Sequence, residues 1–140
     1  MKSCKILMLS FFMVSALFAK AQNPVGKWKV ISDIVTYEGS TYDTHKALLQ
    51  VRPCAAKIFF EINTDGTFRK NTSTCGCDES YRKIQAKLYS ETKWKKVGNK
   101  IYISTLDDFS VGQVYIVSFS GDKMIWEGTE GQGTTTYQRI

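Results

Sequence analysis

Residues 57–71, KIFFEINTDGTFRKN, carry the pattern that decides the fold. Side-chain polarity alternates with a period of two from Lys57 to Ile62 and again from Thr67 to Asn71, which is typical of β-strands. Asp65-Gly66 lies between the two runs, and this dipeptide tolerates the positive φ angles of a tight hairpin turn. The segment therefore predicts an antiparallel β-hairpin.

The same alternation dominates on both sides of this hairpin. Gly26 to Tyr37 predicts a long first strand with two distinct faces. One face carries Trp28, Val30, Ser32 and Ile34, and the other carries Lys27, Lys29 and Asp33. Further strands are predicted at Tyr81–Tyr89, Lys93–Val97, Lys100–Ser104, Gly112–Phe119, Lys123–Glu127 and Thr134–Ile140.

The segment from Gly39 to Arg52 is different, because it is polar and holds a helix-like stretch from His45 to Val51 that Pro53 would end. We predict a long connection with one or two helical turns there. The other connections are tight turns such as Gly98-Asn99. Hairpins joined in sequence form a meander, and a long meander closes into a barrel that has no exposed edges. The sequence therefore predicts an all-β, up-and-down antiparallel β-barrel of about eight strands, and the short, even turns favour it over a β-sandwich.

The N-terminus has the features of a secretory signal peptide. Lys2 and Lys5 precede an apolar run from Ile6 to Phe18, and Ala19-Lys20-Ala21 supplies the small residues that a signal peptidase requires. The run of 13 residues is too short for a membrane-spanning helix, which needs about 20. We therefore predict a signal peptide over residues 1–21, a single domain over residues 22–140 and no membrane span. The protein is expected to be exported, to the periplasm or out of the cell.

The predicted mature chain is weakly basic. Three of the 19 Lys and Arg residues lie in residues 1–21, which leaves 16 against 13 Asp and Glu residues and a net charge of +3. This charge gives little support to nucleic-acid binding. The sequence contains no Gly-x-Ser-x-Gly elbow, Gly-rich phosphate loop or His-Glu-x-x-His motif, so we predict no enzymatic activity and no catalytic residues.

A series of short motifs spans nearly the whole predicted mature chain. They are Gly26-Lys27-Trp28, Cys54, the apolar strand Ile58–Ile62, Asp65-Gly66-Thr67-Phe68, Cys77, the segment Trp94–Asn99 and the closing Thr136-Tyr137-Gln138-Arg139. In this order and spacing the chain resembles the small secreted bacterial lipocalin-like domains of the calycin superfamily. The resemblance implies an up-and-down barrel of about eight strands and a small-molecule ligand. The chain departs from the pattern in the extra Cys75 and in the Gly39–Arg52 connection, which would form a partial lid.

Three cysteines follow the predicted signal peptide, and an exported protein meets an oxidising compartment. If Asp65-Gly66 is a two-residue loop, Cys54 lies opposite Cys77, whereas a loop centred one residue earlier places Cys54 opposite Cys75. Facing residues of a hairpin are within disulfide reach. The Asp-Gly pair favours Cys54–Cys77, which leaves Cys75 free, and this disulfide would stabilise the fold by about 3 kcal/mol.

Cys75-Gly76-Cys77 has a second interpretation as a redox pair, or as a zinc or copper site together with His45 and Cys54. The motif lacks the usual two-residue spacer, and His45 is the single histidine of the chain. We therefore favour the structural disulfide and expect neither a metal nor a cofactor.

The first and last strands become neighbours when a barrel closes. Trp28 would then plug the base of the barrel with the Arg139 guanidinium over its ring, and Gly26 would open the same strand. We interpret Gly26, Trp28 and Arg139 as closing the barrel rather than contacting a ligand.

The inner faces of the predicted strands are rich in aromatic side chains, and such a barrel either holds one small ligand or is filled by its own side chains. Arg82 is notable because a buried arginine needs a partner, which a ligand carboxylate would supply unless Arg82 reaches water at the barrel mouth. The predicted ligand contacts are Phe60, Phe68, Arg82, Ile84, Trp94, Ile103 and Trp126. The favoured function is a monomeric carrier of a small, largely apolar molecule. The alternative is a structural or protein-interaction module with a filled barrel, in which Cys75 cross-links a partner.

Overall fold

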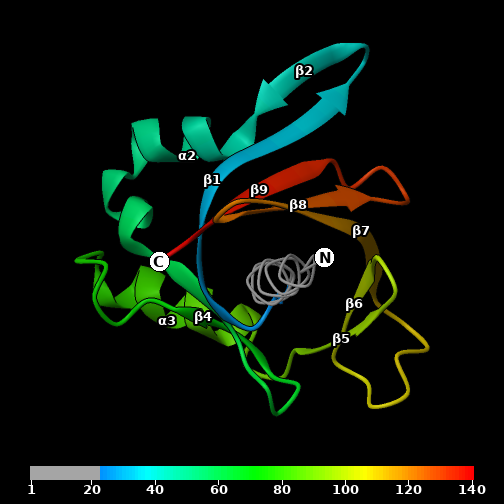
Figure 1. The fold of residues 1–140 in the computed structure, drawn as a ribbon. Helices are drawn as coiled ribbons and strands as arrows, with labels where there is room; N and C mark the ends of the chain where they lie inside the picture. Colours follow the sequence, from blue (N-terminus) through cyan, green and yellow to red (C-terminus); the bar gives the residue numbers. More distant parts are fainter. Residues whose placement is uncertain (1–22) are drawn as a thin grey trace, which may run out of the picture.

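A computed structural model describes residues 23–140 of the chain (Figure 1). The predicted signal peptide, residues 1–21, lies outside this range. Within it the elements are β1 (Gly26–Tyr37), β2 (Ser40–Asp43), α2 (Thr44–Val51), the 3-10 helix η1 (Pro53–Lys57), β3 (Phe59–Ile62), β4 (Phe68–Asn71), α3 (Glu79–Leu88), β5 (Lys93–Val97), β6 (Lys100–Ser104), β7 (Gln113–Ser120), β8 (Lys123–Gly128) and β9 (Thr134–Arg139). None of the helices in residues 23–140 combines the length and the apolar character needed to cross a membrane.

The strands form one antiparallel sheet in the order β4-β3-β1-β9-β8-β7-β6-β5, and β2 pairs with the outer end of β1. The barrel closes between its first and last strands, where Trp28 pairs with Arg139. A looser seam joins β4 to β5, where the Phe68 N–H donates to the Thr92 carbonyl at 3.0 Å and the Trp94 N–H donates to the Gly66 carbonyl at 3.0 Å. The prediction of an up-and-down antiparallel barrel of about eight strands is confirmed.

One end of the barrel is plugged by Trp28, which is 1% exposed. Its indole N–H donates to the Pro24 carbonyl at 2.8 Å, and the Arg139 guanidinium carbon lies 4.2 Å from the ring centroid. Arg139 in turn donates to the Val25 carbonyl at 2.9 Å. Gly26 has a φ of +143°, which favours glycine, and a Cβ there would lie 2.6 Å from Arg139 Nη1, so a side chain at this position would also displace the guanidinium.

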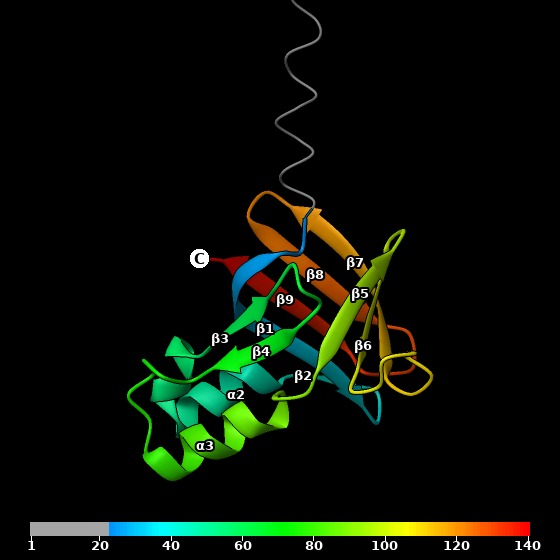
Figure 2. The same ribbon diagram turned by 90° about the horizontal axis from the view of Figure 1, so that it is seen from below.

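The core extends from this plug along the barrel axis. Its buried members are Trp28, Phe60, Ile62, Phe68, Ile101, Val117, Met124, Trp126 and Tyr137. Helices α2 and α3 lie together at the opposite end of the barrel, on the side of β3 and β4 (Figure 2). Ala55, Ile58, Cys75 and Cys77 form a second, smaller core under these helices.

The β3–β4 hairpin has a different turn from the two alternatives predicted. The last strand pair is Ile62 with Phe68, and the Asn63 N–H donates to the Thr67 carbonyl at 3.0 Å. The Gly66 N–H donates to the Asn63 carbonyl at 3.1 Å, and Gly66 has a φ of +86°. This geometry is a three-residue loop with a bulge at Gly66. The register in which β3 pairs with β4 therefore falls between the registers of the two predicted turns.

The predicted strand Tyr81–Tyr89 is wrong, because these residues belong mainly to helix α3. Asp78 caps the helix by accepting a hydrogen bond from the Tyr81 N–H at 2.9 Å. The segment is also rich in Glu, Lys, Gln, Ala and Leu, which favour helix over strand. Its period-two alternation was too short to distinguish the two structures.

The Gly39–Arg52 connection contains the predicted helix, as α2, but also an unpredicted strand. Ser40–Asp43 turns back on the end of β1, pairing Tyr37 with Ser40 and Ile34 with Asp43. The predicted strand at Lys57 starts later than expected, because Pro53 begins the 3-10 helix η1 and β3 starts at Phe59.

Candidate functional site

A cavity of about 310 Å3 lies between the barrel interior and the two helices. This volume is at the lower end of the range for small-molecule sites. The barrel strands contribute Val30, Asp33, Phe60, Lys70, Tyr115, Thr135 and Tyr137 to its lining. The covering segments contribute Thr44, His45, Leu48, Ala55, Ile58, Tyr81, Tyr89 and Gln132.

A β-bulge in β1 directs Asp33 into the cavity. The register between β1 and β9 shifts between Val30, which pairs with Tyr137, and Ser32, which pairs with Thr136. Asp33 therefore pairs with Thr135, and both of these side chains line the cavity. The predicted faces of β1 are wrong beyond the bulge, because the extra residue reverses the alternation.

Asp33 ties helix α2 to the barrel wall. Its Oδ2 accepts a hydrogen bond from the Thr44 hydroxyl at 2.8 Å, and its Oδ1 accepts one from the Thr135 hydroxyl at 2.9 Å. Asp43 caps the same helix by accepting from the Lys46 N–H at 3.0 Å, and this bond lowers the pKa of the Asp43 carboxyl. The start of α2, including His45 and Leu48 over the cavity, is therefore held in place by side chains of β1 and β2.

Tyr89, Tyr115 and Tyr137 are three of the four tyrosines that line the cavity. Burial raises the pKa of Tyr89, raises that of Tyr115 to about 12, and raises that of Tyr137 well above its usual value. All three hydroxyls are therefore protonated near neutral pH and can donate hydrogen bonds. The Tyr115 hydroxyl donates to Gln113 Oε1 at 2.6 Å, and the Tyr137 ring packs edge-on against Phe60 at 5.9 Å.

These shifts predict a loss of stability at alkaline pH. The folded state holds the Tyr115 proton up to a pKa of about 12, whereas the unfolded chain releases it near the unperturbed value of about 10. The stabilisation is complete below the unfolded pKa and is lost as the pH rises through the folded pKa. The free energy of unfolding, measured with urea, should fall as the pH rises between these two values. Tyr115→Phe should make the fall of this free energy with pH less steep. Tyr42→Phe, at a side chain that is 52% exposed, is the matched control and should leave the slope unchanged. An equal slope in wild type and Tyr115→Phe would contradict this origin.

Lys70 projects into the cavity from β4, where it pairs directly with Phe60. Its ammonium lies 5.5 Å from the Phe60 ring centroid and 5.7 Å from that of Tyr89, and it donates to Gln85 Oε1 on α3. Burial lowers the pKa of this ammonium.

Of the residues predicted to contact a ligand, Phe60 lines the cavity. Phe68 and Trp126 pack behind it in the core, with ring centroids 5.8 Å apart. Trp94 and Ile103 pair across β5 and β6 on the rim of the core, and the Trp94 indole N–H donates to the Asn63 carbonyl at 2.9 Å. These four are absent from the cavity lining.

The predicted inward positions of Arg82 and Ile84 are wrong, because both residues lie on helix α3 rather than on a barrel strand. Ile84 is 57% exposed. Arg82 lies against the segment that leads into α3, where its carbonyl accepts from the Thr72 hydroxyl at 3.1 Å and its Nε is buried without a hydrogen-bond partner in residues 23–140.

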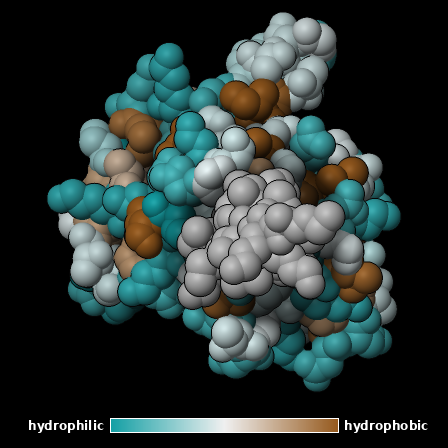
Figure 3. Space-filling model, viewed as in Figure 1, coloured by the Kyte–Doolittle hydropathy of each residue, from teal (hydrophilic) through white to brown (hydrophobic). Residues whose placement is uncertain are grey.

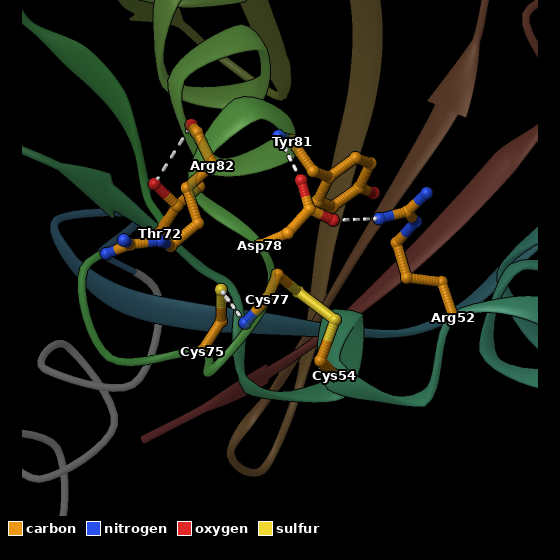
Figure 4. The surroundings of a disulfide bond; sticks show 8 residues. All are labelled: Arg52, Cys54, Thr72, Cys75, Cys77, Asp78, Tyr81 and Arg82. Atoms are coloured by element: carbon orange, nitrogen blue, oxygen red, sulfur yellow. Dashed lines mark hydrogen bonds and ion pairs between the residues drawn. A yellow bond between two sulfur atoms is a disulfide. The ribbon is translucent and has the colours of Figure 1, made fainter.

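The disulfide joins Cys54 to Cys77, with the Cα atoms 5.4 Å apart (Figure 4). The predicted pairing is confirmed, but the hairpin argument for it is wrong, since Cys54 lies in η1 and Cys77 lies just before α3. Cys75 is a free thiol that is 2% exposed, and its Sγ accepts a hydrogen bond from the Cys77 N–H at 3.3 Å. Because Cys77 is in the disulfide, it cannot bind a metal as a thiolate. Cys75 is too buried to form a disulfide with another protein.

The sequence interpretation missed most of the cavity. Lys70 lies two residues after Phe68 on β4, and the Phe68 side chain points inward. The period-two alternation alone therefore indicated that Lys70 also points inward. Tyr137 lies two residues before Arg139 on β9, so the same alternation places both side chains on one face of the strand. Asp33 carried no such signal, because a bulge is visible only in the paired strands.

A nearly closed antiparallel barrel with a cavity at its helix-covered end places the chain among the up-and-down barrels of lipocalin type. Residues 25–126, more than half of the chain, match the family model of the lipocalin-like domain. The chain therefore belongs to the lipocalin-like domain family. No curated protein and no solved structure matches it.

Proposed function

We propose that this chain is an exported protein that binds a small molecule in the cavity beneath α2 and α3 and does not convert it chemically. The observation that carries the proposal is the cavity of about 310 Å3, in which aromatic rings and polar side chains face a common space. The lining combines Phe60, Val30 and Ile58 with Asp33 and Lys70, so the ligand is amphipathic rather than largely apolar. Export rests on the signal-peptide pattern of residues 1–21, and the Cys54–Cys77 disulfide is consistent with an oxidising compartment.

Helix α2 has the role of a lid in this proposal. Thr44, His45 and Leu48 cover the cavity, while the end of β1 and its bulge hold the helix at Asp33. Opening of this lid requires the Thr44–Asp33 hydrogen bond to break, but it does not require the barrel strands to move.

The alternative, a protein-interaction module with a filled barrel, lacks comparable support. Side chains fill the plugged end of the barrel, but the other end has the cavity. On the face drawn in Figure 3, hydrophobic side chains occur as small separate groups among hydrophilic ones rather than as a broad docking surface.

Native mass spectrometry of the protein purified from its own host, with a denatured sample alongside, tests the binding proposal. We expect a native mass excess that disappears on denaturation. Val30→Phe should remove it, because Val30 lines the cavity and a larger ring there fills the space. Ile31→Phe is the matched control, since Ile31 is the next residue and is 43% exposed.

Two outcomes would contradict the proposal. A wild-type native mass equal to that of the mature chain less two hydrogens would mean that the disulfide is formed and no ligand is retained. A mass excess that persists in Val30→Phe would mean that the ligand lies outside this cavity.

A further inference from the structure

Lys70 is the one lysine or arginine among the described residues that line the cavity. Its ammonium has three hydrogen-bond donors, and Gln85 accepts one of them. The aromatic rings of Phe60 and Tyr89 supply further weak stabilisation. No carboxylate of residues 23–140 lies within 4.0 Å of the ammonium, since the ion pairs present involve other residues. Because the ammonium is half-buried and has no counter-ion among these residues, an anion in the cavity would stabilise it.

The other charged group of the cavity does not fill this role. Both carboxylate oxygens of Asp33 accept hydrogen bonds, one from Thr44 and one from Thr135, and these bonds hold α2. Asp33 is therefore already occupied by structural donors, and it makes no ion pair with Lys70.

The remaining lining favours an acceptor-rich, planar ligand. The hydroxyls of Tyr89 and Tyr137, which also line the cavity, stay protonated and can donate hydrogen bonds. The rings of Phe60, Tyr89 and Tyr137 meet edge to face, with Phe60 5.4 Å from Tyr89 and 5.9 Å from Tyr137. Such a group of rings packs well against another aromatic ring. The cavity of about 310 Å3 favours a compact molecule over a long acyl chain.

We propose that the ligand is a compact aromatic monoanion, whose carboxylate pairs with the Lys70 ammonium and whose ring packs against Phe60 and Tyr137. This inference rests on the proposed function and specifies the chemistry of the same cavity. It also assigns Lys70 as the residue that determines specificity.

The test compares two probes of equal shape, 2-naphthoate and the neutral 2-naphthamide, by isothermal titration calorimetry on the mature protein. We expect wild type to bind 2-naphthoate about tenfold more tightly, as one charge-assisted hydrogen bond provides. Lys70→Met should abolish this preference, whereas Lys70→Arg should keep it.

The matched control is Lys95→Met. Lys95 also holds its ammonium near two aromatic rings, 5.2 Å from Tyr102 and 4.7 Å from Phe109, but it does not line the cavity. This variant should keep the preference for 2-naphthoate. Lys70→Gln serves as a second neutral variant if Lys70→Met does not fold.

The outcomes separate the two proposals. Equal affinities of wild type for both probes, with binding still lost in Val30→Phe, would overturn the anionic ligand class and leave cavity binding intact. A preference that survives in both neutral Lys70 variants would also overturn the assignment of Lys70. If wild type binds neither probe, the aromatic monoanion is overturned, and cavity binding is decided by the native mass measurement. If Val30→Phe binds both probes as well as wild type does, the probes bind outside this cavity and both proposals fail.

Discussion

Replacing Trp28 with alanine should lower the free energy of unfolding by about 4 kcal/mol, the largest effect expected of any single substitution in this chain. Trp28 is 1% exposed and closes the barrel where β1 meets β9. Its removal leaves a cavity at the plugged end and leaves the Pro24 carbonyl without its indole donor. It also takes away the ring on which the Arg139 guanidinium lies.

Equilibrium urea unfolding followed by circular dichroism measures this effect. Trp28→Phe should cost less than Trp28→Ala, because it keeps a ring beneath Arg139 and loses the indole hydrogen bond. Tyr42→Ala, at a position that is 52% exposed on β2, should change stability by about 0.5 kcal/mol or less. A Trp28→Ala protein as stable as the Tyr42→Ala control would show that this end of the barrel does not depend on the plug.

Removing the disulfide should give the second largest effect. The Cys54–Cys77 bond joins residues 23 apart in sequence, and loss of such a cross-link costs about 3 kcal/mol in the chain-entropy account. The double variant Cys54→Ala with Cys77→Ala should therefore unfold at a clearly lower urea concentration. The loss should be concentrated under helices α2 and α3, because Cys77 belongs to the smaller core there and Cys54 packs against it.

Cys75→Ala is the matched control for the disulfide. It removes a buried thiol but keeps the cross-link, so its intact mass should still show the loss of two hydrogens and its stability should fall by about 1 kcal/mol. A Cys75→Ala protein with two free thiols would instead mean that Cys54 pairs with Cys75, contrary to the structure. Equal stability of the oxidised wild type and the double variant would show that the bond does not constrain the unfolded chain.

Much of the barrel was predictable from local pattern. The first strand, Gly26–Tyr37, and the β5–β6 hairpin have the limits that their alternation and turn residues indicate. Helix α3 was not predictable from alternation, because ten residues satisfy both a period of two and a period of 3.6 loosely. The Asp78 cap and the helix-forming composition were the signals with more weight.

The candidate site was predicted less well than the fold. Phe60 was placed correctly on the inner face, but the other aromatic residues selected with it pack in the core or on its rim. Period two identifies which side chains point inward, but it does not say at which height along the barrel they lie. The height of a residue decides whether it lies at the end plugged by Trp28 or at the opposite end, where Lys70 and Tyr115 line the cavity.

The sequence by itself determined the class of the protein: alternating strands, tight turns and the Gly26-Lys27-Trp28 start specify a closed antiparallel barrel, because these signals act over neighbouring residues. The tertiary structure alone decided where the cavity lies and what lines it. The bulge that turns Asp33 inward, the register that pairs Lys70 with Phe60, and the docking of α2 and α3 over the open end all depend on contacts between distant segments. A local pattern of side chains does not encode such contacts, since each one is determined by the packing of the completed barrel.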